Sequence, residues 1–171
     1  MSDTKERHSD AARTTNLPDL GARGGGWVAL QVTLGTAILG AGLLDPAWSG
    51  PARVVGVTAG MVAMACGLGL ICAGVLGLRS QLTAYPKPVP GGRLIEDGAF
   101  GLVRHPMYGG GILIGAGWGL ATASPAALAV TVALVIFADL KSRREEAWLV
   151  GQFGGYEAYK RRTRRLIPWL Y

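Results

Sequence analysis

The chain has 171 residues, of which 50% are hydrophobic and only 16% are charged, well below the roughly 25% typical of soluble domains. This composition excludes an ordinary soluble globular protein and indicates a membrane protein. The net charge of +6 is explained by basic residues beside the apolar runs, where they contact anionic lipid headgroups, so no nucleic-acid partner is expected.

The first 23 residues are polar and carry charges of both signs, which is typical of a disordered cytosolic tail and unlike the short basic start of a signal peptide. Residues 24–171 are expected to form one membrane domain. Four apolar runs in it predict helices: Trp27 to Leu44, Val54 to Leu78, Met107 to Ala123, and Ala126 to Phe137. The fold class is therefore predicted to be all-α, a polytopic membrane protein with about four transmembrane helices and a cytosolic C-terminal helical segment.

Lysine and arginine fall almost entirely on one side of this four-helix arrangement. Four precede the first apolar run, four lie between the second and third runs, eight follow the fourth, and only Arg53 lies on the other side. Positively charged segments resist translocation. Both termini and the loop of residues 79–105 are therefore predicted to be cytosolic in a multi-pass protein of the cell (plasma) membrane.

The second apolar run is rich in small residues, and glycines spaced four apart, such as Gly56 and Gly60, let helix backbones approach closely in lipid. Cys66 and Cys72 lie in the same run and face different sides of a helix, so neither a shared metal nor a disulfide is expected between them. Both cysteines are interpreted as small buried apolar residues.

The segment from Arg79 to Arg104 contains too much proline and glycine for a helix, and long irregular loops often carry function. Pro106 suits the first turn of the third helix, where its missing N–H costs nothing. His105 is therefore expected at the entrance of that helix, at the cytosolic edge of the membrane. Farther along the chain, residues 145–153 predict a short separate helix on the bilayer surface.

Three polar clusters should meet at this cytosolic edge: the loop GGRLIEDGAF, the helix start RHPMY, and SRREE followed by FGGYEAY. Each alone has a structural explanation, such as pairing with lipid phosphates, interfacial aromatic residues or charge balance. Together they predict a functional site, because ionisable groups at the edge of hydrocarbon are costly unless they find partners. Carboxylates, aromatic faces and a helix start suit a compact zwitterionic nucleotide.

The stretch RHPMYGG, followed by REEAWLVGQFGGYEAYKRRTRRLIPWLY, resembles the isoprenylcysteine carboxyl methyltransferase and phospholipid methyltransferase superfamily of integral-membrane enzymes. Their pattern is R-H-P-x-Y-x-G, then E-E-x-x-L-x-x-x-F-G-x-x-Y-x-x-Y, then R-x-x-P. The resemblance covers about Leu78 to Pro168. It implies methyl transfer from S-adenosylmethionine to a lipophilic acceptor, a small molecule or a lipidated substrate with a carboxylate, thiol or amine, at the cytosolic face among membrane lipids.

The resemblance also implies a cofactor site within residues 91–165. Its contacts fall on Gly92, Arg93, Leu94, Ile95, Phe100, His105, Pro106, Met107, Tyr108 and Glu145. Lys141, at the position of a substrate-binding arginine, and the nearby Arg144 are implied to position the acceptor. The family usually has tyrosine at the position of Phe100. Phenylalanine keeps the aromatic face and lacks the hydroxyl. Lys141 keeps the charge of arginine and loses its planar two-point grip.

Two other classes of function stay open at this point. An NADPH-dependent membrane reductase of the sterol-reductase type is similar over the same C-terminal pattern, although such enzymes usually have many more spans. The other class is a non-catalytic small membrane protein, such as a transporter subunit or a scaffold, for which charged or polar residues are expected inside the spans. The span interiors offer essentially only Gln31, threonines and Asp139, which argues against transport. No metal site is expected, because the two histidines and the acidic residues form no cluster at ligand spacing.

Overall fold

The computed structural model describes residues 17–44 and 48–167, and over these ranges the chain is helical, with a single isolated β-bridge between Val103 and Arg164. The helices are α2 (Gly25–Leu44), α3 (Gly50–Leu78), the short 3-10 helix η1 (Arg79–Gln81), α4 (Ala99–Leu102), α5 (Pro106–Thr122), α6 (Pro125–Gln152) and α7 (Tyr156–Arg162). The predicted all-α class is confirmed.

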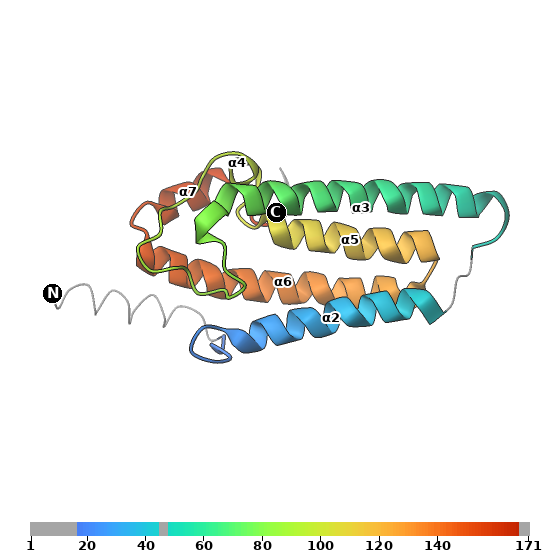
Figure 1. Cartoon of the computed structure of the whole chain (residues 1–171), viewed down its shortest axis with the longest axis horizontal. Helices are drawn as coiled ribbons and strands as arrows, with labels where there is room; N and C mark the ends of the chain where they lie inside the picture. The colour runs from blue at the N-terminus through green and yellow to red at the C-terminus, as the bar shows by residue number, and fades with distance from the viewer. Residues whose placement is uncertain (1–16, 45–47, 168–171) are drawn as a thin grey trace.

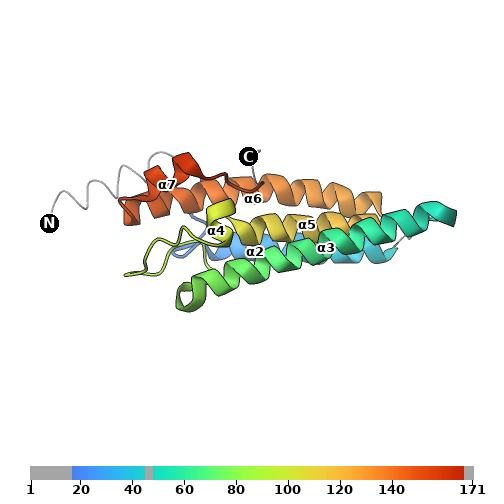
Figure 2. The same cartoon turned by 90° about the horizontal axis from the view of Figure 1, so that it is seen from above.

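The four long helices α2, α3, α5 and α6 lie side by side along one direction (Figures 1 and 2). Among the described residues, three stretches are long and apolar enough to cross a membrane: α2, α3 with η1, and α6. The third predicted run forms α5, whose 17 residues extend about 26 Å, slightly less than the hydrocarbon thickness of about 30 Å. The structure thus has the character of a polytopic membrane protein.

The last long helix differs from the sequence prediction. We expected a span ending near Phe137 and a separate surface helix over residues 145–153, but α6 continues unbroken to Gln152. No glycine or proline occurs between Ala126 and Val150, so nothing in the local sequence interrupts the helix. As a result, Lys141 and the two consecutive glutamates share one rigid helix.

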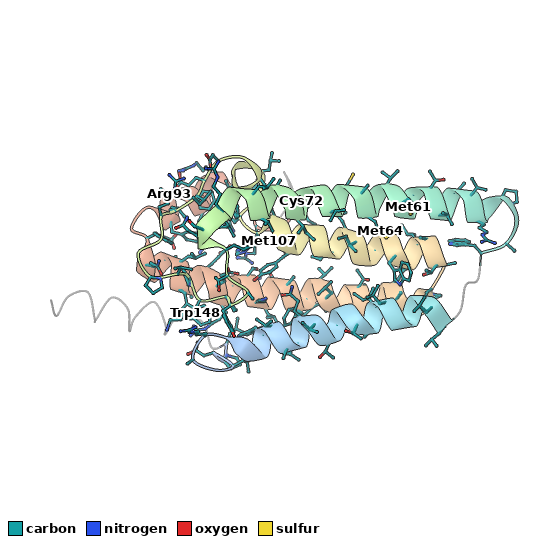
Figure 3. The ribbon with its side chains drawn as sticks, in the orientation of Figure 1. Met61, Met64, Cys72, Arg93, Met107 and Trp148 are labelled. Atoms are coloured by element: carbon teal, nitrogen blue, oxygen red, sulfur yellow. The ribbon has the colours of Figure 1, made fainter. Side chains whose placement is uncertain are left out.

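Close packing of α3 against α5 depends on glycine. A Cβ atom at Gly60 would collide with the backbone carbonyl of Gly117, and one at Gly67 would collide with that of Gly110, so only glycine permits this separation. Met64 lies near this contact, whereas Met61 and Cys72 lie on the outer surface of α3 (Figure 3).

The prediction that both cysteines are buried is wrong. Cys66 and Cys72 are exposed and free. The buried positions of α3 are all glycines, and it is through this glycine-lined face that the helix packs against α5. The other faces of α3, where the cysteines lie, are left open to the surroundings of the bundle.

A tight turn joins α5 to α6. Ala123 adopts a left-handed conformation (φ 53°) that ends α5, and the Ser124 hydroxyl oxygen accepts a 3.1 Å hydrogen bond from the N–H of Ala127 at the start of α6. The same hydroxyl donates to the carbonyl of Ala41 on α2, at 2.9 Å. The hairpin therefore returns the chain to the end of the bundle where α5 begins, and α2 is tied to the same unit.

The predicted tail of residues 1–23 lies for the most part outside the described residues, which begin at Leu17. Within the described part, the indole N–H of Trp27 donates to the carbonyl of Pro18, at 3.2 Å. Asp19 forms an ion pair with Arg144 of α6. These contacts attach residues 18 and 19 to the membrane domain.

Candidate functional site

A cavity of about 400 Å³ lies at the end of the bundle, where α3 ends, α5 begins and the C-terminal half of α6 passes. The loop of residues 82–98 covers it and is tied to α6 by a 2.8 Å hydrogen bond from the Gln152 side chain to the carbonyl of Val89. All ten residues that the family resemblance implied as cofactor contacts line this cavity: Gly92, Arg93, Leu94, Ile95, Phe100, His105, Pro106, Met107, Tyr108 and Glu145. Lys141 lines it as well.

His105 lies at the N-terminal boundary of α5, with Pro106 as the first helical residue, as the sequence predicts. The His105 carbonyl accepts hydrogen bonds from the N–H groups of Tyr108 and Gly109, at 3.1 and 3.2 Å, and these bonds close the first turn. The imidazole lies parallel to the Tyr108 ring, with 5.3 Å between ring centroids and 4° between planes. One helix start thus presents two stacked rings at the cavity.

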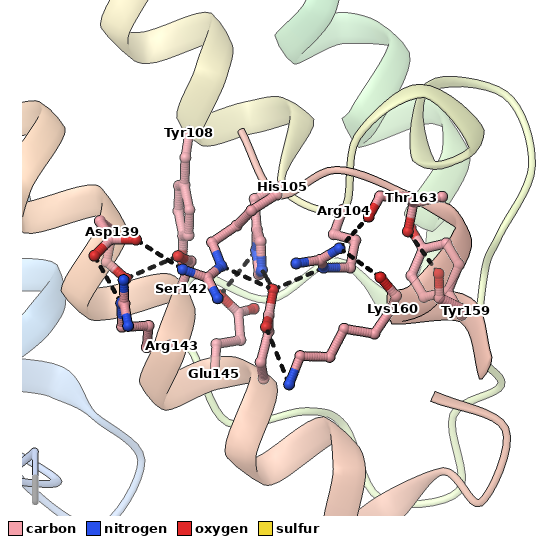
Figure 4. Close-up of polar contacts among 12 residues, drawn as sticks. Arg104, His105, Tyr108, Asp139, Ser142, Arg143, Glu145, Tyr159, Lys160 and Thr163 are labelled. Atoms are coloured by element: carbon pink, nitrogen blue, oxygen red, sulfur yellow. Dashed lines mark hydrogen bonds and ion pairs between the residues drawn. The ribbon is translucent and has the colours of Figure 1, made fainter. Parts of the chain in front are cut away.

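Facing these rings, α6 supplies Lys141 and Glu145, which share one side of the helix because they are four residues apart. The Tyr108 hydroxyl donates a 2.7 Å hydrogen bond to Glu145 Oε2, and His105 Nδ1 is 3.7 Å from the same oxygen. The three side chains that were predicted to converge are therefore brought together (Figure 4).

Lys141 is buried with its ammonium 4.9 Å from the centre of the Tyr108 ring, and it donates a hydrogen bond to Gln31 Oε1 on α2. Gln31 was recognised in the sequence as a polar residue within a span and was not assigned to the site. Its placement beside a buried cation explains why an amide is tolerated in that apolar helix.

A second carboxylate, Glu146, lies behind the imidazole and was not predicted. Its Oε1 atom accepts hydrogen bonds from Arg104 Nε at 2.8 Å, His105 Nε2 at 3.2 Å and Arg165 Nε at 3.3 Å (Figure 4). The backbone N–H groups of Arg104 and His105 also donate to carbonyls of the segment after α7, those of Arg164 and Arg165. This C-terminal segment therefore holds the start of α5 in place.

Arg144, which the family resemblance assigned to positioning the acceptor, is not among the residues that line the cavity. Its guanidinium pairs with Asp19 and lies 4.7 Å from the ring centre of Trp148. Asp19 precedes the membrane domain by sequence, and its approach to α6 could not be inferred from local patterns.

Phe100, Tyr156 and Tyr159 form an aromatic wall of the cavity. The Tyr159 hydroxyl donates a 2.7 Å hydrogen bond to the carbonyl of Phe100, and the two tyrosine rings meet edge to face at 5.6 Å. Burial raises the pKa of both tyrosine hydroxyls, and nearby carboxylates act in the same direction, that of Glu146 on Tyr156 and that of Glu96 on Tyr159. Both phenols are therefore neutral at physiological pH.

Within residues 17–44 and 48–167, no three histidine, cysteine, aspartate or glutamate side chains lie close enough together to hold a metal ion. The acidic and basic groups at the cavity instead pair with one another. Groups of this kind can offer a ligand hydrogen bonds and charge.

The fold and site together define an integral-membrane protein with a largely apolar cavity at one end of its helices, into which a few charged and polar side chains project. Residues 55–155, more than half of the chain, match the phospholipid methyltransferase family, and the chain belongs to this family. The family is part of the isoprenylcysteine carboxyl methyltransferase-like superfamily, and membership indicates that the protein is a membrane methyltransferase. Searches of curated proteins and of solved structures found no match.

Proposed function

We propose that this protein transfers a methyl group from S-adenosylmethionine to a lipophilic acceptor at the cytosolic face of the cell membrane. One observation carries the proposal: in a chain of a methyltransferase family, a single cavity gathers His105 and Tyr108 from α5 with Glu145 from α6. The proposed orientation, with both termini cytosolic, depends on the distribution of lysine and arginine.

The cavity suits the cofactor in size and in chemistry. Its volume of about 400 Å³ lies within the range of roughly 300 to 1,000 Å³ of small-molecule sites. The Glu145 carboxylate can accept hydrogen bonds from ribose hydroxyls, and the Phe100 ring offers a face for adenine. His105 and the start of α5 can hold the amino-acid end or the adenine, while Tyr108 shapes the pocket and orients Glu145.

A second cavity of about 270 Å³ supports a lipophilic acceptor. It lies between α2, α5 and α6, is lined by apolar side chains such as Ile38, Ile114 and Phe137, and shares Gln31, Met107 and Tyr108 with the first cavity. An apolar chain of the acceptor would occupy this space. Its polar head would then lie near the Lys141 ammonium, which attracts an anionic or polar group.

The protein's task in this reaction is alignment and exclusion of water. S-adenosylmethionine supplies a methyl group that is already activated by its positively charged sulfur. The helices α5 and α6 hold the cofactor side of the site, and Lys141 holds the acceptor head. Such alignment can contribute on the order of 7 to 11 kcal/mol to the lowering of the barrier. An acceptor that is already anionic, such as a carboxylate or thiolate, needs no general base.

The test is incubation of the purified protein with S-adenosylmethionine carrying a labelled methyl group and with an extract of membrane lipids. We expect a labelled lipid, identified by mass spectrometry, and loss of labelling in Glu145→Ala and His105→Ala. Glu157→Ala, which removes an exposed carboxylate on α7 outside the cavity, is the matched control. Folded protein that neither labels lipid nor releases heat on titration with the cofactor contradicts the proposal. Oxidation of NADPH by the purified protein in the presence of the same lipid extract would favour the reductase class.

A further inference from the structure

The imidazole of His105 lies between two consecutive carboxylates. Its Nε2 atom is 3.2 Å from Glu146 Oε1, and its Nδ1 atom is 3.7 Å from Glu145 Oε2 (Figure 4). The ring is buried, with 7% of the residue exposed. The proposed function uses Glu145 and gives Glu146 no role.

Glu146 Oε1 acts as an acceptor only. It already accepts hydrogen bonds from two guanidinium groups, those of Arg104 and Arg165, so this oxygen cannot itself carry a hydrogen toward the imidazole. The hydrogen in the contact between His105 and Glu146 must therefore be on Nε2. Hydrogen bonding at one ring nitrogen determines the state of the other.

In the neutral ring, Nδ1 is then the nitrogen without a hydrogen. It faces Glu145 Oε2, another acceptor, and the 3.7 Å between them is too long for a hydrogen bond. His105 Nδ1 and Glu145 Oε2 are thus two neighbouring acceptors at the cavity wall. A hydrogen-bond donor from a bound ligand could satisfy both. The Tyr108 hydroxyl on α5 already donates a hydrogen bond to the Glu145 carboxylate and orients it.

We infer that Glu146 is a positioning residue: it holds His105 in the tautomer with hydrogen on Nε2, so that Nδ1 and Glu145 form a pair of acceptors for a donor group of the ligand. That donor is an O–H or N–H, as in a ribose hydroxyl or an ammonium. The statement about the ligand rests on the proposed function, whereas the tautomer does not.

The two glutamates divide these roles because of helix geometry. Consecutive side chains on α6 point about 100° apart, so Glu145 reaches the cavity while Glu146 reaches the C-terminal segment. Arg165, which binds Glu146, lies beyond the part of the chain that matches the family, and its carbonyl also accepts the His105 N–H at 3.0 Å. Glu146 thus binds the ring of His105, and Arg165 binds both Glu146 and the backbone of His105.

A purely structural role for Glu146 would be to neutralise the two arginines that pair with it, Arg104 and Arg165. That role would not specify which nitrogen of His105 carries the hydrogen, so the tautomer distinguishes the two explanations. It can be measured directly, because the chain has two histidines and His8→Gln leaves only His105.

The experiment is nitrogen NMR of the His8→Gln protein labelled with ¹⁵N-histidine, in detergent and in a mildly alkaline buffer. We expect a protonated Nε2 and an unprotonated Nδ1 in the absence of ligand. A ring with its hydrogen on Nδ1 overturns the inference. In Glu146→Ala the two tautomers should coexist, whereas an unchanged single tautomer in the folded variant would show that Glu146 does not select it.

Addition of S-adenosylhomocysteine tests the acceptor pair. The chemical shift of Nδ1 should change as the ligand is added and stop changing when the site is saturated, while Nε2 keeps its hydrogen. Binding seen by calorimetry without movement of the Nδ1 resonance overturns the acceptor pair. Absence of any binding overturns the proposed function, and with it the acceptor pair, while the tautomer is still decided by the ligand-free spectrum.

Discussion

The hydroxyl of Tyr108 on α5 donates a 2.7 Å hydrogen bond to Glu145 Oε2 on α6, so two side chains 37 residues apart in the sequence meet at the cavity. The bond fixes the carboxylate before any ligand arrives. Fixed groups bind more tightly than mobile ones, because less conformational freedom is lost on binding. This relationship makes Glu145 the first residue to test.

Glu145→Gln should weaken binding of S-adenosylmethionine by about 10- to 150-fold, because hydrogen bonds to a charged group contribute about 1.5 to 3 kcal/mol. The dissociation constant can be measured by calorimetric titration in detergent. Glu157→Gln, an exposed carboxylate on α7, is the matched control and should bind as the wild type does. Equal affinities in all three proteins would remove Glu145 from the cofactor site.

Lys141→Met should raise the KM for the lipid acceptor by about 10-fold or more and leave the dissociation constant of the cofactor nearly unchanged. The substitution keeps an unbranched chain and removes the buried ammonium that contacts Gln31 and Tyr108. Steady-state kinetics with the identified lipid provides the measurement. In Arg144→Met the same KM should not change, since that guanidinium pairs with Asp19; a rise would restore the role predicted from the sequence.

Gly60→Ala should destabilise the protein by about 1 to 3 kcal/mol, the usual cost of inserting a methyl group into a packed contact. A Cβ at this position collides with the backbone carbonyl of Gly117, which cannot move aside as a side chain would. Gly69→Ala on the same helix is the control, because no atom lies within 4 Å of its Cβ position. Thermal unfolding in detergent should separate the two variants, and identical curves would argue against close packing of α3 on α5.

Tyr159→Phe should cost about 0.5 to 1.5 kcal/mol, because it removes the hydrogen bond to the Phe100 carbonyl. Tyr156→Phe should be neutral or stabilising, since the buried Tyr156 hydroxyl has no hydrogen-bond partner within the described part of the chain. The two variants make the same chemical change at neighbouring positions. In denaturant unfolding, Tyr159→Phe should be the less stable of the two variants, and the reverse order would contradict the hydrogen bond between Tyr159 and Phe100.

Stability should fall as the pH rises above about 10, the ordinary pKa of tyrosine and hence its value in the unfolded chain. Burial raises the pKa of Tyr156 and Tyr159 in the folded state. The unfolded chain therefore loses protons that the folded protein keeps, and the free energy of unfolding decreases with pH. The double variant Tyr156→Phe, Tyr159→Phe should show a shallower decrease, measured by unfolding at about pH 9 and about pH 11. A slope equal to that of the wild type would contradict the burial of these phenols.

The sequence by itself determined where the helices form and where α5 begins. Apolar runs, the proline after His105 and the serine before Pro125 act over a few neighbouring residues, and their effects can be read locally. It also placed His105, Tyr108 and Glu145 at one end of the bundle, because short connections make neighbouring apolar helices antiparallel. What the local pattern misjudged was the length of α6, where basic and acidic residues continue the helix beyond its apolar part.

Only the tertiary structure decided which polar groups become partners. Glu145 and Glu146 are adjacent residues with the same side chain, yet one lines the cavity and the other binds the imidazole of His105. The pairing of Arg144 with Asp19 and of Lys141 with Gln31 joins residues more than a hundred positions apart. Such contacts depend on how helices pack and rotate against each other, and that is decided by the shapes of whole helix surfaces such as the glycine face of α3.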